Sequence, residues 1–182
     1  MDTSAYSLAV RELLAAERLS ELGPGQPNVA ARPLLTALSV DTVCAGRAIR
    51  DRAAVQACLA GLWLYHDFLD ESHQLSQDLS SLEGSFWHGI LHRREPDYAN
   101  AAYWFRRVGR HPVFAELGTA AGQLAASSGS SLSIPSSWDP FWFIDYCEEC
   151  ANGPESGQQL ARLIQQQEWD LLFTYCYQRA IG

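Results

Sequence analysis

The chain has 182 residues, of which 47% are hydrophobic and 19% are charged, and its formal net charge is −8. This length and composition are typical of a globular protein with a sizeable hydrophobic core. The acidic balance argues against a general nucleic-acid binder or an anionic-membrane binder, since such proteins carry a broad basic surface. We therefore expect a single domain over residues 1–182, with no nucleic-acid partner and no membrane partner.

The N-terminal segment and the cysteines favour a cytoplasmic location. Residues 1–23 resemble an amphipathic helix rather than a signal peptide. No apolar run approaches the ~18 residues that a transmembrane helix needs. The chain has five cysteines, and an odd number without a signal peptide favours reduced thiols in the cytosol.

Apolar residues at helical spacing predict an all-α fold, a helical bundle of about seven helices. The first three helices are expected at about residues 4–22, 33–44 and 49–80. Further helices are expected over 81–95, 96–108, 112–127, 140–151 and 156–181. The Ser/Gly-rich stretch 127–139 predicts a flexible loop within the domain.

Several residues mark the expected helix boundaries. Ser80 and Glu83 have the spacing of a capping box. Pro96 ends one helix and begins the next, which Gly109 then stops. Pro112 begins another helix by the same logic.

The expected helix over 49–80 changes from apolar to polar along one face. His66, Asp70, His73 and Gln77 continue the stripe that Leu59, Leu62 and Trp63 begin. Buried polar groups are costly unless they bond to each other, to a ligand or to a metal. Either this helix emerges from the core near Tyr65, or its polar end lines a cavity.

The next helix repeats this arrangement. His88, His92 and Glu95 lie at i, i+4 and i+7, on one face. Consecutive helices joined by a short turn usually pack antiparallel. This packing predicts that His73 and His88 approach each other along the shared seam.

Three interpretations of these polar side chains remain open. The first is a metal site, because imidazoles are ligands for zinc, nickel, iron and manganese, and i, i+4 histidines can share one ion. The candidate metal ligands are His66, His73, His88 and His92. The second is a metal-free polar pocket, and the third is a structural or surface hydrogen-bond network.

An arginine and aromatic block follows, with Asn100, Trp104 and Arg107 on one helix face. Guanidinium groups bind carboxylate or phosphate through two parallel hydrogen bonds. We predict that Arg93 or Arg107 binds an anionic small molecule, which Asn100 and Trp104 help to orient. Alternatively, the arginines pair with acidic residues and lock helices together.

The remaining motifs do not indicate a cysteine-based metal or redox site, or a nucleotide-binding site. Cys147 and Cys150 form a C-x-x-C pair, but no second pair accompanies them, and they are interpreted as two buried thiols on one helix turn. No phosphate-binding glycine motif is found. The sequence therefore gives no indication of an ATP, NAD or flavin site.

The stretches CLAGLWLYHDFLDESHQLSQ and GSFWHGILHRREPDYANAAYWFRRVGRHPVF resemble the signature segments of a family of uncharacterised microbial and fungal proteins. The resemblance covers about a third of the chain. It implies no particular activity. Because the signature includes the histidines and arginines named above, it favours one shared site.

Two functions follow from these observations. The first is a small-molecule pocket with acid–base or metal-assisted chemistry on an anionic substrate, in which His88, His92, Glu95 and Asp70 are catalytic. The alternative is a non-catalytic binding or interaction module, in which the histidines and arginines form a structural polar network.

Overall fold

A computed structural model describes residues 3–182, and within this range the regular structure is entirely helical. The helices are α1 (Leu8–Leu13), α2 (Arg32–Ala37), α3 (Arg52–Tyr65), α4 (Leu69–Gln77), α5 (Leu82–Arg94), α6 (Tyr98–Val108), α7 (Val113–Ser127), α8 (Pro140–Ala151) and α9 (Glu155–Ile181). The all-α prediction is confirmed, although two of the expected helices are much shorter and one is divided.

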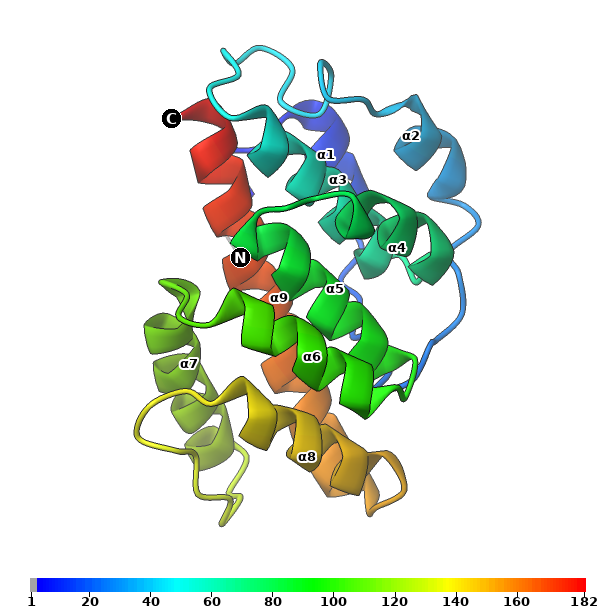
Figure 1. Ribbon diagram of the computed structural model, residues 1–182. Coiled ribbons are helices and arrows are strands. Elements are labelled where there is room, and N and C mark those ends of the chain that lie inside the picture. The colour runs from blue at the N-terminus through cyan, green and yellow to red at the C-terminus, as the bar shows by residue number, and fades with distance from the viewer. Residues whose placement is uncertain (1–2) are drawn as a thin grey trace.

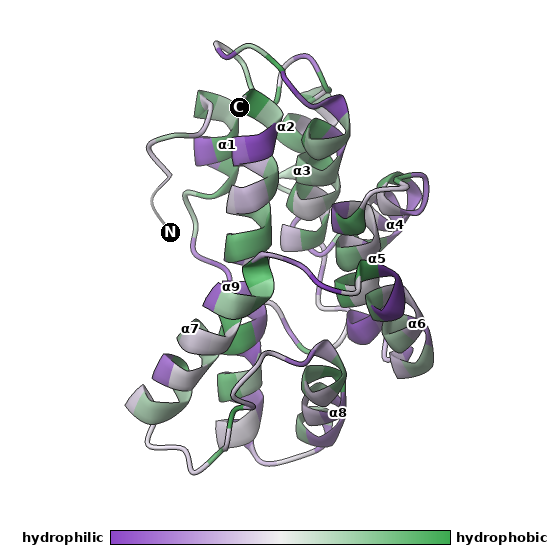
Figure 2. Cartoon of the chain, turned by 60° about the vertical axis from the view of Figure 1, so that its left-hand side comes forward, coloured by the Kyte–Doolittle hydropathy of each residue, from purple (hydrophilic) through white to green (hydrophobic). Residues whose placement is uncertain are grey.

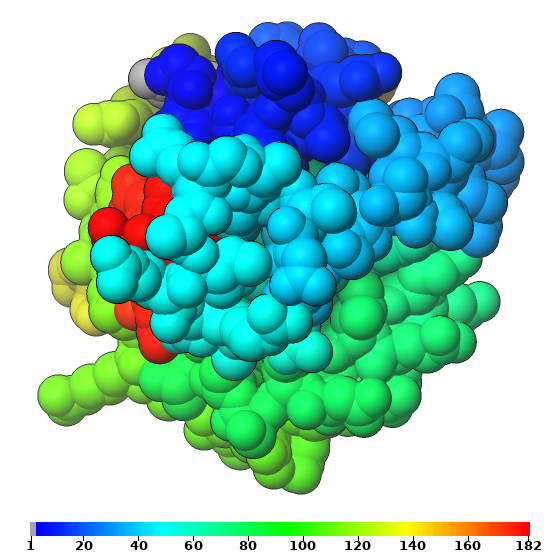
Figure 3. Space-filling model, turned by 90° about the horizontal axis from the view of Figure 1, so that it is seen from above, coloured from blue at the N-terminus to red at the C-terminus, as the bar shows by residue number. Residues whose placement is uncertain are grey.

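The longest helix, α9, is the centre of the bundle. Helix α3 packs beside its C-terminal half, and α7 and α8 pack around its N-terminal half (Figure 1). Helices α4, α5 and α6 lie on one side of α9, as the turned view shows (Figure 2). Seen from above, the N-terminal third of the chain covers the end of the molecule where α9 finishes (Figure 3).

The first helix is far shorter than the expected span of residues 4–22. Helix α1 ends at Leu13 because the backbone beyond it finds partners on α9 instead of within a helix. Arg162 donates hydrogen bonds to the carbonyls of Leu19 and Ser20, at 2.6 and 3.1 Å. Gln165 donates to the next carbonyl, that of Glu21, at 3.0 Å. Tertiary hydrogen bonds therefore override the local helical periodicity here.

The expected helix over residues 49–80 is two helices. Helix α3 ends at Tyr65 and α4 begins at Leu69, with Asp67 between them at φ 62°. A non-glycine residue in this left-handed region needs support from its surroundings. Arg18 and Arg94 give that support by donating to the Asp67 carboxylate at 2.6 and 2.5 Å. The predicted continuous polar face from His66 to Gln77 is therefore interrupted.

Helices α5 and α6 begin and end close to the predicted residues. The capping residue of α5 is Ser81 and not Ser80, since the Ser81 hydroxyl accepts from the Gly84 amide at 3.1 Å. Helix α6 begins after Asp97, whose carboxylate accepts from the Asn100 amide. It ends at Gly109 with φ 60°, as predicted.

Glycines allow the helices around α5 to approach closely. A Cβ atom on Gly89 would lie 2.8 Å from the ring of Phe105 on α6. A Cβ atom on Gly61 would lie 2.7 Å from the indole of Trp87 on α5. Because both glycines lack a side chain, the Phe105 ring packs directly on the backbone of α5, and the Trp87 indole packs directly on the backbone of α3. Helix α5 is therefore packed closely between α6 and α3.

The hydrophobic core is continuous and takes buried side chains from every described helix except α4, whose Leu69 and Leu75 pack against it partly buried. All five cysteines are buried and free, Cys147 and Cys150 among them, as interpreted from the sequence. Burial raises the pKa of the Cys147 thiol to about 12, which keeps it protonated and unreactive. Among residues 3–182, no helix combines the length and the hydrophobicity needed to cross a membrane.

Candidate functional site

Three histidines meet where α4 packs against α5. His73 lies on α4, and His88 and His92 lie one turn apart on α5. Each can offer one ring nitrogen so that the three atoms all lie within 4.8 Å of one another. The Nε2 atoms of His73 and His88 are 3.1 Å apart. The predicted approach of His73 and His88 along this seam is confirmed.

The spacing of these nitrogens is close to that of ligands around one ion. Two imidazole nitrogens on a tetrahedral zinc ion lie roughly 3.3 Å apart, given Zn–N bonds of about 2.0–2.1 Å. The His73 and His88 nitrogens are already at this separation. His92 adds a third nitrogen from the same helix as His88, within 4.8 Å of the other two.

The far nitrogens of two of the rings have polar partners. His92 Nδ1 lies 2.9 Å from a carboxylate oxygen of Glu95. His88 Nδ1 lies 3.4 Å from the Ser76 hydroxyl, which in turn donates to the His73 carbonyl. With protons on both Nδ1 atoms, the Nε2 atoms of His88 and His92 are acceptors, which His73 and Asn100 approach to 3.1 Å.

Helix α6 covers the cluster with the face that the sequence predicted. The Trp104 indole stacks on the His88 ring with centroids 3.9 Å apart. The exposed guanidinium of Arg107 lies over the same indole, 5.1 Å from its centroid. The Asn100 amide nitrogen is 3.1 Å from His92 Nε2. These three residues therefore form one wall of the site, with Arg107 at its outer edge.

Burial keeps two of the clustered histidines, His88 and His92, uncharged. Burial, together with the neighbouring rings of His73 and His92, lowers the pKa of His88 to about 3. Burial also lowers the pKa of His92, although Glu95 opposes this shift. Both rings are consequently neutral at pH 7, which is the form that binds a metal ion.

Two of the predicted site residues lie outside this cluster. His66 follows the end of α3 and bonds to the Asn28 amide through Nδ1 at 3.1 Å. Asp70 lies in the first turn of α4, and its side chain is exposed. The break between α3 and α4 rotates both residues away from the seam. The structure thus does not place His66 with the other candidate ligands, or Asp70 with the histidines.

The arginines next to His92 are inside the protein and paired. Arg93 is fully buried and donates to Glu168 and Gln165 on α9. Arg94 is 1% exposed and pairs with Asp67 at 2.5 Å. Arg93 therefore has no free donors facing solvent for the predicted anionic ligand. Of the two arginines proposed for that role, only Arg107 lies at the edge of the histidine cluster.

Two residues that matter here were not identified from the sequence. Ser76 is one helix turn beyond His73, on the face of α4 that meets α5, and this i, i+3 spacing was a usable signal. Glu168 lies 75 residues from its partner Arg93. The only sequence pattern that pointed to Glu168 was the position of a carboxylate within the mostly apolar buried face of α9.

Comparison of the chain with family models, with curated proteins and with solved structures gives no match. The histidine cluster therefore has to be interpreted from its own geometry.

Proposed function

We propose that this protein binds a divalent transition-metal ion through His73, His88 and His92 and uses the open side of the ion for chemistry on a small anionic ligand. The observation that supports this most directly is the convergence of three imidazole nitrogens within 4.8 Å. Three neutral imidazoles with an open fourth position are the donor set of catalytic zinc sites. A bound ion would supply Lewis acidity and would lower the pKa of a coordinated water molecule.

The groups around the cluster suit this role. Glu95 accepts from His92 Nδ1, which is the carboxylate–histidine arrangement that orients metal ligands and raises their basicity. In this proposal Glu95 positions His92, and His88 and His92 hold the ion instead of transferring protons. Arg107 is the cation nearest the open edge, where it would attract an anionic ligand.

The competing function is the metal-free network, and one contact favours it. The Asn100 amide is directed at His92 Nε2, at 3.1 Å, so an ion at this nitrogen requires Asn100 to turn aside. If the histidines only satisfy each other, Asn100 contributes a hydrogen bond to stability and its removal destabilises the protein. If they bind a metal, Asn100→Ala leaves the affinity for the ion unchanged or increases it.

The test is metal analysis of the untagged protein, purified without chelator, and titration of the metal-free protein with Zn²⁺ and Co²⁺. We expect one equivalent of either ion, with a Co²⁺ visible spectrum typical of low coordination number. His88→Ala and His92→Ala should lose the ion. His73→Ala is the safest variant for folding, because His73 is the only one of the three that is partly exposed.

His66→Gln is the matched control, because His66 is as buried as His88 but lies outside the cluster. It should bind the ion like the wild type. Absence of binding after reconstitution would remove the proposal, as would binding that survives all three alanine substitutions. Phosphate added to the Co²⁺ form should change its spectrum, and Arg107→Gln should weaken that effect.

A further inference from the structure

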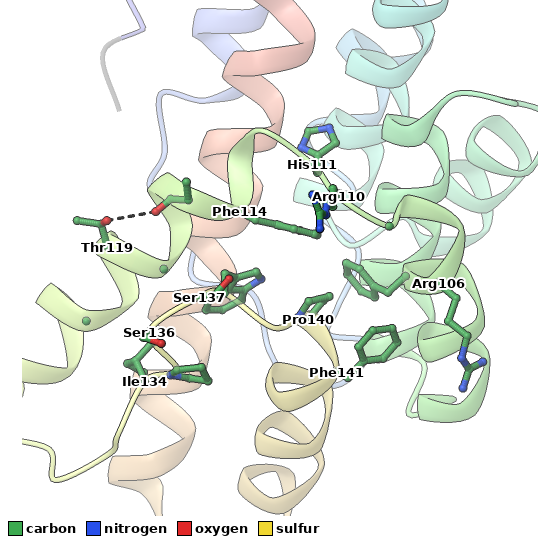
Figure 4. A pocket seen from close by; sticks show the side chains of 17 residues that line it. Arg106, Arg110, His111, Phe114, Thr119, Ile134, Ser136, Ser137, Pro140 and Phe141 are labelled. Carbon is green, nitrogen blue, oxygen red and sulfur yellow. Dashed lines mark hydrogen bonds between the residues drawn. The ribbon is translucent and has the colours of Figure 1, made fainter.

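A large cavity lies on the other side of α6 from the histidines. It has a volume of about 1020 Å³, is open to solvent on one side, and is lined by the end of α6, the first three turns of α7, the loop 134–138 and the start of α8. Figure 4 shows Arg110 beside His111 and Phe114 on one side of this space, and Arg106 beside Phe141 on another. None of the three clustered histidines lines it.

The charge of the cavity is opposite to that of the whole protein. The chain has 21 acidic residues, yet the described residues that line this cavity include no aspartate and no glutamate. They include Arg106 and Arg110, which are exposed and make no ion pair with any residue from 3 to 182. Asp139 precedes Pro140 of the lining in sequence, but its carboxylate caps α8 by accepting from the Phe141 amide at 2.9 Å.

Aromatic side chains form another part of the cavity wall. Phe114, Trp138 and Phe141 line it, and Phe141 is 37% exposed although it is a large apolar side chain. The indole nitrogen of Trp138 is buried and has no hydrogen-bond partner among the described residues. Exposed aromatic rings beside unpaired donors are typical of sites that bind a ligand with an apolar body.

A glycine keeps one wall of this cavity open. Gly122 is inside α7, where glycine costs roughly 1 kcal/mol relative to alanine. A Cβ atom on Gly122 would meet nothing within 4 Å, so packing does not require glycine there. The missing side chain leaves space that belongs to the cavity.

From these features we infer that the cavity binds a small organic anion, a carboxylate or phosphate carried on an aromatic body, with Arg110 facing the anionic group. The body of the ligand would lie against Phe114 and Phe141. This inference rests on residues outside the metal cluster, so it stands or fails separately from the proposed function.

The first probe is 8-anilinonaphthalene-1-sulfonate, an aromatic anion whose fluorescence rises in an apolar site. Its neutral counterpart, N-phenyl-1-naphthylamine, has the same rings without the anionic group. We expect saturable binding of one anionic probe per folded protein, with clearly weaker binding of the neutral compound. Displacement by phenyl phosphate and by phenylacetate then distinguishes a phosphate ligand from a carboxylate ligand.

Two pairs of variants locate the site. Gly122→Leu places a bulky side chain in the cavity and should weaken probe binding, whereas Gln123→Leu adds the same side chain at an exposed neighbouring position outside the lining. Arg110→Gln should weaken binding about 3- to 10-fold, the range for one solvent-exposed charge-assisted hydrogen bond. Arg47→Gln removes an exposed arginine far along the chain and should have no effect.

Three results would overturn the inference. The first is the absence of saturable probe binding to the folded protein. The second is equal affinity for the neutral and the anionic probe, which would mean a merely apolar cavity. The third is binding that Gly122→Leu and Arg110→Gln leave unchanged, because the probe would then lie elsewhere. Because leucine is a better helix former than glycine, loss of the fold does not explain a loss in Gly122→Leu.

Discussion

Neighbouring residues at the end of α5 belong to two quite different buried polar regions. Arg93 and Arg94 reach the interior, where Glu168 and Asp67 neutralise them. His92, immediately before them, joins His73 and His88 in a cluster whose ring nitrogens face one another. The arginines pair with carboxylates from distant parts of the chain, whereas the histidines contact mainly one another.

This difference shows how a structural network can be separated from a candidate site. In the arginine region both guanidinium groups pair with carboxylates, so the region locks α5 to α9 and to the turn before α4. In the histidine region the Nε2 atoms of His73 and His88 lie 3.1 Å apart, so the two imidazoles contact each other rather than a carboxylate. A group of imidazoles that contact mainly one another is a set of side chains that a ligand can bridge.

The largest effect on stability is expected from breaking the arginine region. Glu168→Gln leaves the fully buried Arg93 without its counter-charge and should lower the free energy of unfolding by about 3–5 kcal/mol. Urea unfolding measures this loss. Glu71→Gln removes the partly exposed partner of Arg32 and should cost less than about 1 kcal/mol. Equal effects in the two variants would contradict the structural role of Arg93.

Stabilisation of the folded protein by added zinc should depend on the histidine region alone. Zinc at a hundred times its dissociation constant should stabilise the wild-type protein by about 2.7 kcal/mol, through preferential binding to the folded state. His73→Ala should lose this zinc-dependent gain, and Glu168→Gln should retain it despite its lower stability. Thermal unfolding with and without zinc measures both. If the two variants lose the gain alike, the two regions do not have separate roles.

A smaller effect is expected from the carboxylate behind the cluster. Glu95→Gln keeps the shape of the side chain but removes the charge that orients His92. Loss of such an outer partner typically weakens metal affinity about 10- to 100-fold. Competition with a chromophoric chelator measures the change. Glu116→Gln, an exposed carboxylate on α7, is the control, and an equal change there would point to a general charge effect.

The smallest effect concerns His66, which is buried but outside the cluster. Burial and the nearby charge of Arg18 lower the pKa of His66 to about 4, against about 6.5 in the unfolded chain. The unfolded state therefore takes up the proton first, and stability falls as the pH drops from about 6.5 to 4. His66→Gln should reduce the loss between pH 7 and 5 by about 1–2 kcal/mol. An unchanged pH profile in urea unfolding would contradict this assignment.

Local signals in the sequence predicted the helix boundaries where local interactions decide them. Gly109 ends α6, and Pro140 begins α8, as expected. The face formed by Asn100, Trp104 and Arg107 was also predictable, because residues three and four apart on a helix are neighbours. The cap at Ser81 differs from the predicted Ser80 by one residue: Ser80 has the capping-box spacing to Glu83, but the Ser81 hydroxyl is the one that accepts from the Gly84 amide.

Contacts between distant segments decided the features that the sequence did not predict. Arg18 and Arg94 hold Asp67 in the left-handed conformation that separates α3 from α4. That break is the reason that His66 and Asp70 leave the seam. No periodicity could show this, because the partners are 27 and 49 residues from Asp67 in the chain.

The sequence by itself determined the helical class, the i, i+4 pairing of His88 and His92, and the seam that brings His73 to them. These follow from the geometry of one helix and of a short turn between two helices. The tertiary structure alone decided which arginines are occupied and which remain open to a ligand. Glu168 reaches Arg93 across 75 residues, whereas Arg110 has no carboxylate partner in the part of the chain that the structure describes. The physical reason is that charge pairing depends on distances in space, and folding sets those distances only when remote helices pack together.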